Sequence, residues 1–141
     1  MPAEVLVDTG AILALLDKSD EWHSVCQSAF LQLRYPLLTS EAVLTELFHM
    51  LGDSQRRIEA AWQLFRSGII MVGTIEHSEL HHIQSLMSRD SDRPMDFADA
   101  TLVYLAARES IQVIFTVDQT DFSIYRIAGK RRFHILPVER P

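Results

Sequence analysis

Several acidic residues stand where a folded chain would bury them. Asp8 directly follows the apolar run 5–7 and has no lysine or arginine nearby, and Asp118 directly follows the apolar run 113–117. A buried carboxylate normally needs a partner, because desolvation of an unpaired charge costs free energy or raises the pKa of the group. The sequence leaves three partners open for Asp8: a metal ion, a second aspartate in a protease dyad, or the first turn of a helix.

Two further acids join these strand-end residues. Asp99 shares a helix face with the apolar residues three, four and seven positions later, so its side chain is expected to point toward the core. Glu46 borders the apolar stripe of a predicted helix over 41–51. Like charges gathered from distant segments would repel each other unless a cation lay between them. Carboxylate ligands favour Mg²⁺ or Mn²⁺ over zinc, and such ions activate water and neutralise charge at a phosphate.

Each acid also has an ordinary structural explanation. Asp8 can cap a helix over 10–16, and Asp96 with Asp99 resembles a capping box that has aspartate in place of glutamate. The others can occupy a solvent-exposed helix edge or a turn: Glu46, Asp118 and Asp121. Their combination, rather than any one of them, favours a metal site.

Short apolar runs alternate with helical patterns along the chain. The runs predict strands at 5–7, 36–40, 69–72, 113–117 and 134–138. The helical patterns lie at 10–16, 21–34, 41–51, 54–66, 76–88 and 96–109. Asp20 and Ser40 are candidate N-caps, and Ser67-Gly68 is a typical helix terminator. The strand at 134–138 is expected at a sheet edge because it contains Pro137.

This alternation predicts an α/β fold with three layers, α/β/α, around a central, mostly parallel sheet of about five strands. Ligands bind such sheets beyond the carboxyl ends of the strands, where Asp8 and Asp118 stand. With 141 residues and no linker or repeat, the chain is expected to form one domain over 1–141.

Composition narrows the range of functions. No apolar run approaches the length that a transmembrane helix needs, and the N-terminus lacks a signal-peptide pattern. Cys26 is the only cysteine, so it forms no internal disulfide, and we expect it to be buried and inert in a cytoplasmic protein. A formal net charge of −6 argues against binding nucleic acid by charge alone, but it is compatible with a nuclease whose acids hold a metal.

The acids, in their order and contexts, resemble those of the PIN-domain nucleases, and especially the VapC-type toxins of bacterial toxin–antitoxin pairs. The resemblance covers nearly the whole chain and rests on the segments 5–23, VLTEL (43–47), DFADATLVYLA (96–106), FTVDQTDFSIYR (115–126) and HILPV (134–138). It implies a Mg²⁺- or Mn²⁺-dependent endoribonuclease that cleaves RNA, forms a homodimer and binds a cognate antitoxin protein.

The resemblance also implies roles for single residues. The catalytic and metal-binding acids of the family correspond to Asp8, Glu46, Asp99 and Asp118. Two hydroxyl residues and two further acids are expected to support them: Thr9, Thr116, Asp96 and Asp121. The spacing before the Asp121-Phe122 pair departs from the family pattern, so the resemblance does not fix the orientation of that pair.

An RNA substrate also needs cations, because an acidic pocket repels the phosphate backbone wherever no metal intervenes. The best candidates flank the polar stretch before Asp99 or follow the Asp118 loop: Arg89, Arg93, Lys130, Arg131 and Arg132. Arg56, Arg57 and Arg66 come next. For each cation alone, a solvated surface position is the alternative.

Four other interpretations stay open. The DTGA motif at 8–11 resembles aspartic proteases, but their fold is almost wholly β and this motif opens a helical segment. A receiver domain also gathers aspartates at strand ends. It normally has two acids after its first strand and a lysine after a later strand, and this sequence has neither pattern. His77 and His81 share a helix face that could bind zinc. A PIN fold without activity would act only as a binding module. Separately, the apolar residues of helices 41–51 and 54–66 either supply a dimer or antitoxin groove or belong to the core.

Overall fold

The central element of the fold is a parallel sheet, seen in a computed structural model that describes residues 2–89 and 94–141. Its strands are β1 (Val5–Val7), β2 (Leu37–Ser40), β3 (Ile70–Gly73), β4 (Val113–Phe115) and β7 (His134–Leu136). They lie in the order β3-β2-β1-β4-β7, and every neighbouring pair is parallel. The predicted sheet of about five strands is confirmed, and β7, which precedes Pro137, is an edge strand as expected.

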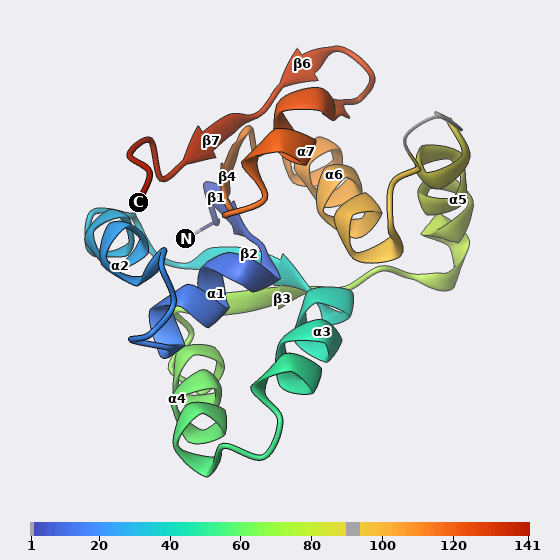
Figure 1. The fold of residues 1–141 in the computed structure, drawn as a ribbon. Coiled ribbons are helices and arrows are strands. Elements are labelled where there is room, and N and C mark those ends of the chain that lie inside the picture. Colours follow the sequence, from blue (N-terminus) through green and yellow to red (C-terminus); the bar gives the residue numbers. More distant parts are fainter. Residues whose placement is uncertain (1, 90–93) are drawn as a thin grey trace.

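Helices flank this sheet and complete the predicted layers (Figure 1). They are α1 (Thr9–Leu16), α2 (His23–Leu31), α3 (Glu41–Leu51), α4 (Gln55–Arg66), α5 (Leu80–Ser88), α6 (Phe97–Glu109) and α7 (Gln119–Ile124). The helix α1 packs against α2 and α3, while α5 packs against α6. A short antiparallel pair, β5 (Arg126–Ile127) and β6 (Arg131–Arg132), follows α7. Within the part of the chain that the structure describes, no helix is long and apolar enough to cross a membrane.

Apolar residues of the central strands fill the interior. Every residue of β1 is buried, because helices cover both faces of the sheet. Such strands form continuous apolar runs rather than alternating ones, so the sequence predicts them from the short length of the run and its β-branched residues rather than from periodicity. On α6, Leu102 and Leu105 are fully buried, so this helix is held against the sheet. Cys26 is buried as expected, and burial raises the pKa of its thiol to about 12.

One predicted helix start and one predicted helix end are confirmed, and another predicted helix start is wrong. The hydroxyl of Ser40 caps α3 by accepting from the N–H of Val43 (3.3 Å), and Gly68, with φ 85°, follows the end of α4. Asp20, however, is not the N-cap of the second helix, which spans His23–Leu31 rather than 21–34. Its carboxylate accepts from the N–H of Trp22 (2.8 Å), and Trp22, two residues later, occupies the N-cap position.

Three other differences arise from short segments. The helix predicted over 76–88 begins as a 3₁₀ turn, η1 (His77–Glu79). The strand predicted over 113–117 ends at Phe115, because the chain then turns into α7. The sequence pattern predicts neither α7 nor the β5–β6 pair, since each is too short to show a clear periodicity.

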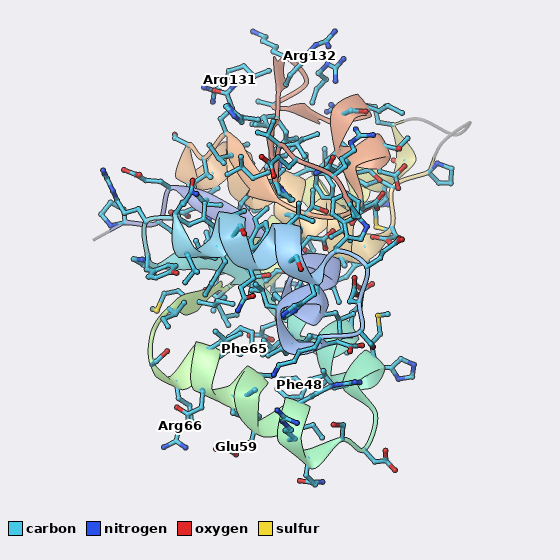
Figure 2. All side chains as sticks on the ribbon, turned by 60° about the vertical axis from the view of Figure 1, so that its left-hand side comes forward. Phe48, Glu59, Phe65, Arg66, Arg131 and Arg132 are labelled. Atoms are coloured by element: carbon cyan, nitrogen blue, oxygen red, sulfur yellow. The ribbon has the colours of Figure 1, made fainter. Side chains whose placement is uncertain are left out.

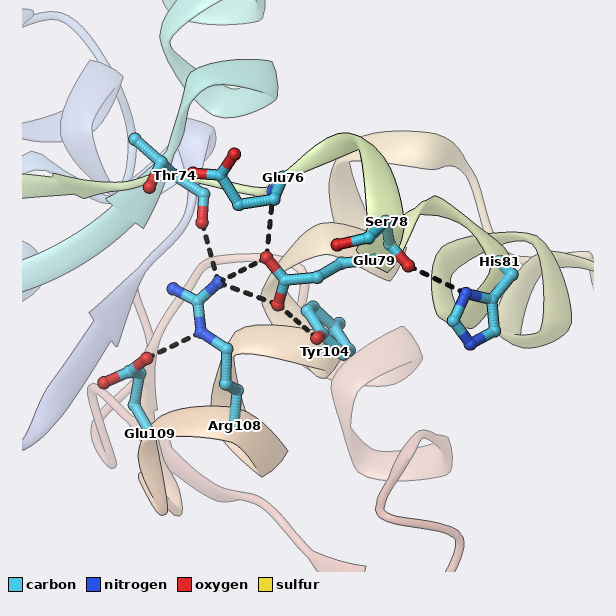
Figure 3. A network of polar contacts seen from close by, with 8 residues as sticks. All are labelled: Thr74, Glu76, Ser78, Glu79, His81, Tyr104, Arg108 and Glu109. Carbon is cyan, nitrogen blue, oxygen red and sulfur yellow. Dashed lines mark hydrogen bonds and ion pairs between the residues drawn. The ribbon is translucent and has the colours of Figure 1, made fainter.

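A polar network ties the segment after β3 to α6 (Figure 3). Arg108 Nη1 donates to the carbonyl oxygen of Thr74 (2.7 Å) and to the Glu79 carboxylate (3.1 Å). The Tyr104 hydroxyl donates to the same carboxylate. Because Tyr104 and Arg108 lie in the second half of α6, the network holds the part of the helix away from the first turn, which carries Asp99.

Candidate metal centre

Asp8 lies where β1 ends and α1 begins, and it is only 6% exposed. Its backbone N–H still belongs to the sheet, because it donates to the carbonyl oxygen of Phe115 (3.0 Å). Its carboxylate has two donors: the N–H of Thr9 reaches Oδ1 (2.8 Å), and the hydroxyl of Thr116 reaches Oδ2 (3.0 Å). The hydrogen bond from Thr9 to Oδ1 is therefore the one expected of a helix cap. Oδ2 points instead toward Thr116, just after the end of the neighbouring strand β4.

Asp118 occupies the corresponding place after β4, at the N-cap position of α7. Its N–H donates to the hydroxyl oxygen of Thr116 (3.0 Å), so one hydroxyl accepts from Asp118 while it donates to Asp8. The side chain of Asp121, in the first turn of α7, hydrogen-bonds to Asp118. The DQTD segment is thus the start of a short helix rather than an ordinary turn.

Asp99 comes from the first turn of α6 and is 7% exposed. Its N–H donates to Asp96 Oδ1 (2.8 Å), so Asp96 caps the helix as predicted. The other half of the proposed capping box is wrong, because the Asp99 carboxylate does not turn back to Asp96. Its Oδ2 instead accepts from the hydroxyl of Tyr125 (2.9 Å), the residue that ends α7.

These three aspartates converge. Ligand oxygens of Asp8, Asp99 and Asp118 all lie within 4.8 Å of one another. They line a hollow of about 380 Å³ whose walls also include Glu46 and Asp96. Three carboxylates without histidine or cysteine form a donor set that fits a hard divalent cation such as Mg²⁺ or Mn²⁺.

Glu46 lies beside this cluster rather than in it. It stands on an exposed position of α3 and lines the same hollow. Its Oε1 accepts from the hydroxyl of Thr9 (2.8 Å), whose N–H bonds to Asp8. The structure therefore brings three of the four predicted acids into direct proximity and places the fourth as a neighbour.

The cluster is electrostatically unfavourable without a cation. Burial raises the pKa of Asp8 to about 6, reinforced by Asp118 and Glu46 and opposed by the bonds from Thr9 and Thr116. Burial also raises the pKa of Asp99 to about 8, with further contributions from Asp8 and Asp96. The pKa of Asp118 is raised by burial and then by Asp121. A bound divalent cation would offset this repulsion and favour the ionised carboxylates.

Among the described RNA-binding candidates, Arg89 lies close to the turn between β5 and β6, because Arg89 and Gly129 line the same pocket. Arg89 lines a separate pocket of about 180 Å³ together with Arg126 and Tyr125. Arg131 and Arg132 extend from β6 at one end of the molecule, whereas Arg66 projects from α4 at the opposite end (Figure 2).

Three further cations that the sequence proposes for RNA binding lie elsewhere in the chain: Lys130, Arg57 and Arg93. Lys130 is exposed in the turn between β5 and β6. Arg57 is ion-paired with Asp17 (3.2 Å). Arg93 lies outside the described residues.

Sequence reasoning missed Tyr125 and Arg126. An aromatic residue in an apolar segment is usually part of the core, and nothing in the pattern distinguishes Tyr125 from such a residue. Its contact with Asp99 depends on α7, which the sequence pattern does not predict and which ends at this residue.

The zinc alternative is not supported. Among residues 2–89 and 94–141, the aspartate cluster is the one group of at least three side chains placed to share a metal. His77 lies in η1 and His81 in α5, so the two residues do not share one α-helix as predicted, and His81 Nδ1 lies 2.9 Å from the carbonyl oxygen of Ser78. The parallel sheet also excludes the almost wholly β fold of aspartic proteases.

Comparisons with known proteins agree with this geometry. Residues 5–130 match the PIN domain family. Ribonuclease VapC26 of Mycobacterium tuberculosis is 25% identical over 143 residues, which cover 94% of this chain and 100% of that protein. The crystal structure of Mycobacterium tuberculosis VapC20, a sarcin–ricin loop cleaving toxin, superposes with a TM-score of 0.73 at 22% identity, covering 83% of this chain and 93% of the other. The family match confirms the resemblance seen in the acidic motifs, and the chain belongs to the PIN domain family.

Proposed function

We propose that the protein is a metal-dependent endoribonuclease that hydrolyses RNA phosphodiester bonds as the toxin of a toxin–antitoxin pair. The observation that carries this proposal is the convergence of Asp8, Asp99 and Asp118 from three separate elements of the fold. Membership of the PIN domain family and the ribonuclease name of VapC26 support the same function.

In this proposal Asp8, Asp99 and Asp118 hold Mg²⁺ or Mn²⁺, and Glu46 acts from the wall of the hollow. The ion supplies charge neutralisation and water activation at the phosphodiester. Hydroxyl groups of the chain orient the acids: the Thr116 hydroxyl donates a hydrogen bond to Asp8, and the Thr9 hydroxyl donates one to Glu46. No side chain has to act as a nucleophile.

Contacts to the RNA backbone are proposed on the side of the site where Arg89 lies. The Tyr125 hydroxyl donates a hydrogen bond to Asp99, and the same residue lines the pocket that also contains Arg89 and Arg126, so its side chain connects that pocket to the acids. A phosphate or a neighbouring nucleotide of the substrate can meet the arginines there. Lys130, Arg131 and Arg132 are proposed to extend this contact along the β5–β6 pair, and Arg93 remains a prediction.

Protein partners are proposed at the surface of α3 and α4. Met50 is 62% exposed and lines the metal hollow, and Trp62 is 42% exposed and packs on Phe48 with 4.8 Å between ring centroids. This apolar surface beside the site suits a cognate antitoxin that covers the acids. Homodimer formation is proposed from the family resemblance, and a cytoplasmic location from the single cysteine, Cys26.

The test is RNA cleavage by protein freed of metal with EDTA. Activity should appear when Mg²⁺ or Mn²⁺ is restored and should be absent before. RNA binding without cleavage under every metal condition would instead favour the inactive binding module.

A further inference from the structure

The hydrogen bond between Tyr125 and Asp99 joins two elements that the sequence does not connect. Tyr125 follows α7 as its C-cap and is 7% exposed, and its hydroxyl donates to Asp99 Oδ2 over 2.9 Å. Its N–H donates to the carbonyl oxygen of Asp121 (3.1 Å), which fixes the backbone at this point. The tyrosine thus spans from the end of α7 to the first turn of α6.

The ring that carries this hydroxyl is also held in place. It meets Phe122 edge-to-face, with centroids 5.1 Å apart and an interplanar angle of 81°. Phe122 is fully buried and meets Phe133 in the same way, at 5.4 Å and 87°. Edge-to-face contacts of this kind are favourable arrangements of aromatic rings. The hydroxyl is therefore delivered to Asp99 by a packed aromatic group rather than by a mobile surface side chain.

The orientation of the Asp99 carboxylate depends on a single hydrogen-bond donor in the described part of the chain, whereas the Asp8 carboxylate has two donors. Both carboxylate oxygens of Asp8 accept hydrogen bonds, from Thr9 and from Thr116. For the Asp99 carboxylate, Tyr125 is the one donor found among the described residues. The N–H of Asp99 bonds to Asp96 and holds the helix, but it does not set the rotation of the carboxylate.

We propose that Tyr125 is a positioning residue that holds the Asp99 carboxylate in the orientation that binds the metal ion. The inference rests on the proposed metal-dependent function and adds a residue outside the acidic set. With Oδ2 turned toward the tyrosine hydroxyl, Oδ1 is left for the ion. Groups that orient a ligand in this way typically change metal affinity by about 10- to 100-fold when they are removed.

A second tyrosine of the chain provides a matched control. The Tyr104 hydroxyl also donates to a carboxylate, that of Glu79 (Figure 3). Neither residue lines the metal hollow. Tyr104→Phe therefore removes the same atom from the same kind of pair at a distance from the acids.

The experiment is a titration of metal-free protein with Mn²⁺, followed by electron paramagnetic resonance and by calorimetry. Tyr125→Phe should bind Mn²⁺ about tenfold more weakly than wild type, and Tyr104→Phe should bind it as wild type does. In the Asp99→Asn background, Tyr125→Phe should cause no comparable further loss. Equal Mn²⁺ affinity of folded Tyr125→Phe and wild-type protein would overturn the proposal, as would an undiminished effect of Tyr125→Phe in the Asp99→Asn background.

Circular dichroism and thermal unfolding establish that each variant is folded at the titration temperature. If Tyr125→Phe does not fold, Phe122→Leu keeps the hydroxyl but loosens the ring, and it should weaken Mn²⁺ binding in the same direction. Wild-type affinity in that variant would then overturn the proposal. Failure of the proposed function looks different: Asp99→Asn itself would leave Mn²⁺ binding unchanged.

Discussion

The hydroxyl oxygen of Thr116 lies 3.0 Å from Oδ2 of Asp8, although 108 positions separate the two residues in the chain. Adjacent parallel strands make this possible, since Val7 of β1 is paired in register with Phe115 of β4. The same oxygen accepts from the N–H of Asp118, so Thr116 connects the two strand-end acids.

Thr116→Val should therefore weaken the site while preserving the size of the side chain. It removes the donor to Asp8 and the acceptor for the Asp118 N–H, and loss of a buried partner typically costs about 1–3 kcal/mol. Urea unfolding and Mn²⁺ titration should both show the loss. Thr116→Ser, which keeps the hydroxyl, is the control, and equal behaviour of the two variants would refute the role of this hydroxyl.

The raised pKa values predict how the stability of the metal-free protein depends on pH. The pKa of Asp99 is raised from 3.8 to about 8, so the folded protein binds this proton more tightly than the unfolded chain does. The stabilisation is complete below about pH 4 and is lost as pH rises through the pKa values of Asp8, about 6, and Asp99.

Thermal unfolding in EDTA between about pH 4 and pH 9 measures this effect. The stability gained by Asp99→Asn relative to wild type should grow as pH rises through this window, because the variant cannot ionise at that position. Saturating Mg²⁺ should reduce the difference or reverse its sign. A difference between the two proteins that does not change with pH would show that the Asp99 carboxyl has no raised pKa.

Gly10 offers a test of the packing that places Asp118. A Cβ added at Gly10 would lie 2.5 Å from Cγ2 of Val117, the residue before Asp118. Alanine is normally preferred over glycine inside a helix by about 1 kcal/mol, so the sign of the effect depends on this contact. Gly10→Ala should lower the thermal midpoint and weaken Mn²⁺ binding.

The Val117→Ala background removes the obstructing methyl group. Gly10→Ala should then be neutral or stabilising when compared with Val117→Ala alone. If Gly10→Ala is equally destabilising in both backgrounds, the contact with Val117 is not the cause.

Arg89 is predicted to contact RNA phosphate from the pocket beside Tyr125. Arg89→Ala should weaken RNA binding for all sequences and reduce the slope of log affinity against log salt by about one. Arg34→Ala, which removes an exposed arginine that is ion-paired with Glu4 (3.3 Å) and is not an RNA-binding candidate, is the control. An unchanged salt slope for Arg89→Ala would move the phosphate contact to Lys130, Arg131 and Arg132.

The sequence predicts the acids well because the sheet is parallel. In such a sheet the carboxyl ends of neighbouring strands lie together, so Asp8 and Asp118 could be placed near each other before any contact was known. Helical periodicity likewise predicted that the Asp99 side chain points toward the core, and the residue is 7% exposed.

Residues that depend on short, irregular segments could not be predicted in the same way. The six-residue helix α7 gives no periodic signal, yet it brings Tyr125 to Asp99. The position of Asp20 illustrates the same limit, because its carboxylate could satisfy either a helix start or the preceding turn, and the turn prevailed.

The most direct test of the central claim is the rate of cleavage of a defined RNA by metal-stripped protein as Mn²⁺ is added, compared between wild type and Asp99→Asn. Wild type should be inactive before the addition and active after it, and the folded variant should be slower by roughly 100-fold or more at the same Mn²⁺ concentration. Asp8→Asn, Glu46→Gln and Asp118→Asn should behave similarly. Cleavage at the full rate in EDTA, or by folded Asp99→Asn protein, would contradict a metal-dependent site built on these acids.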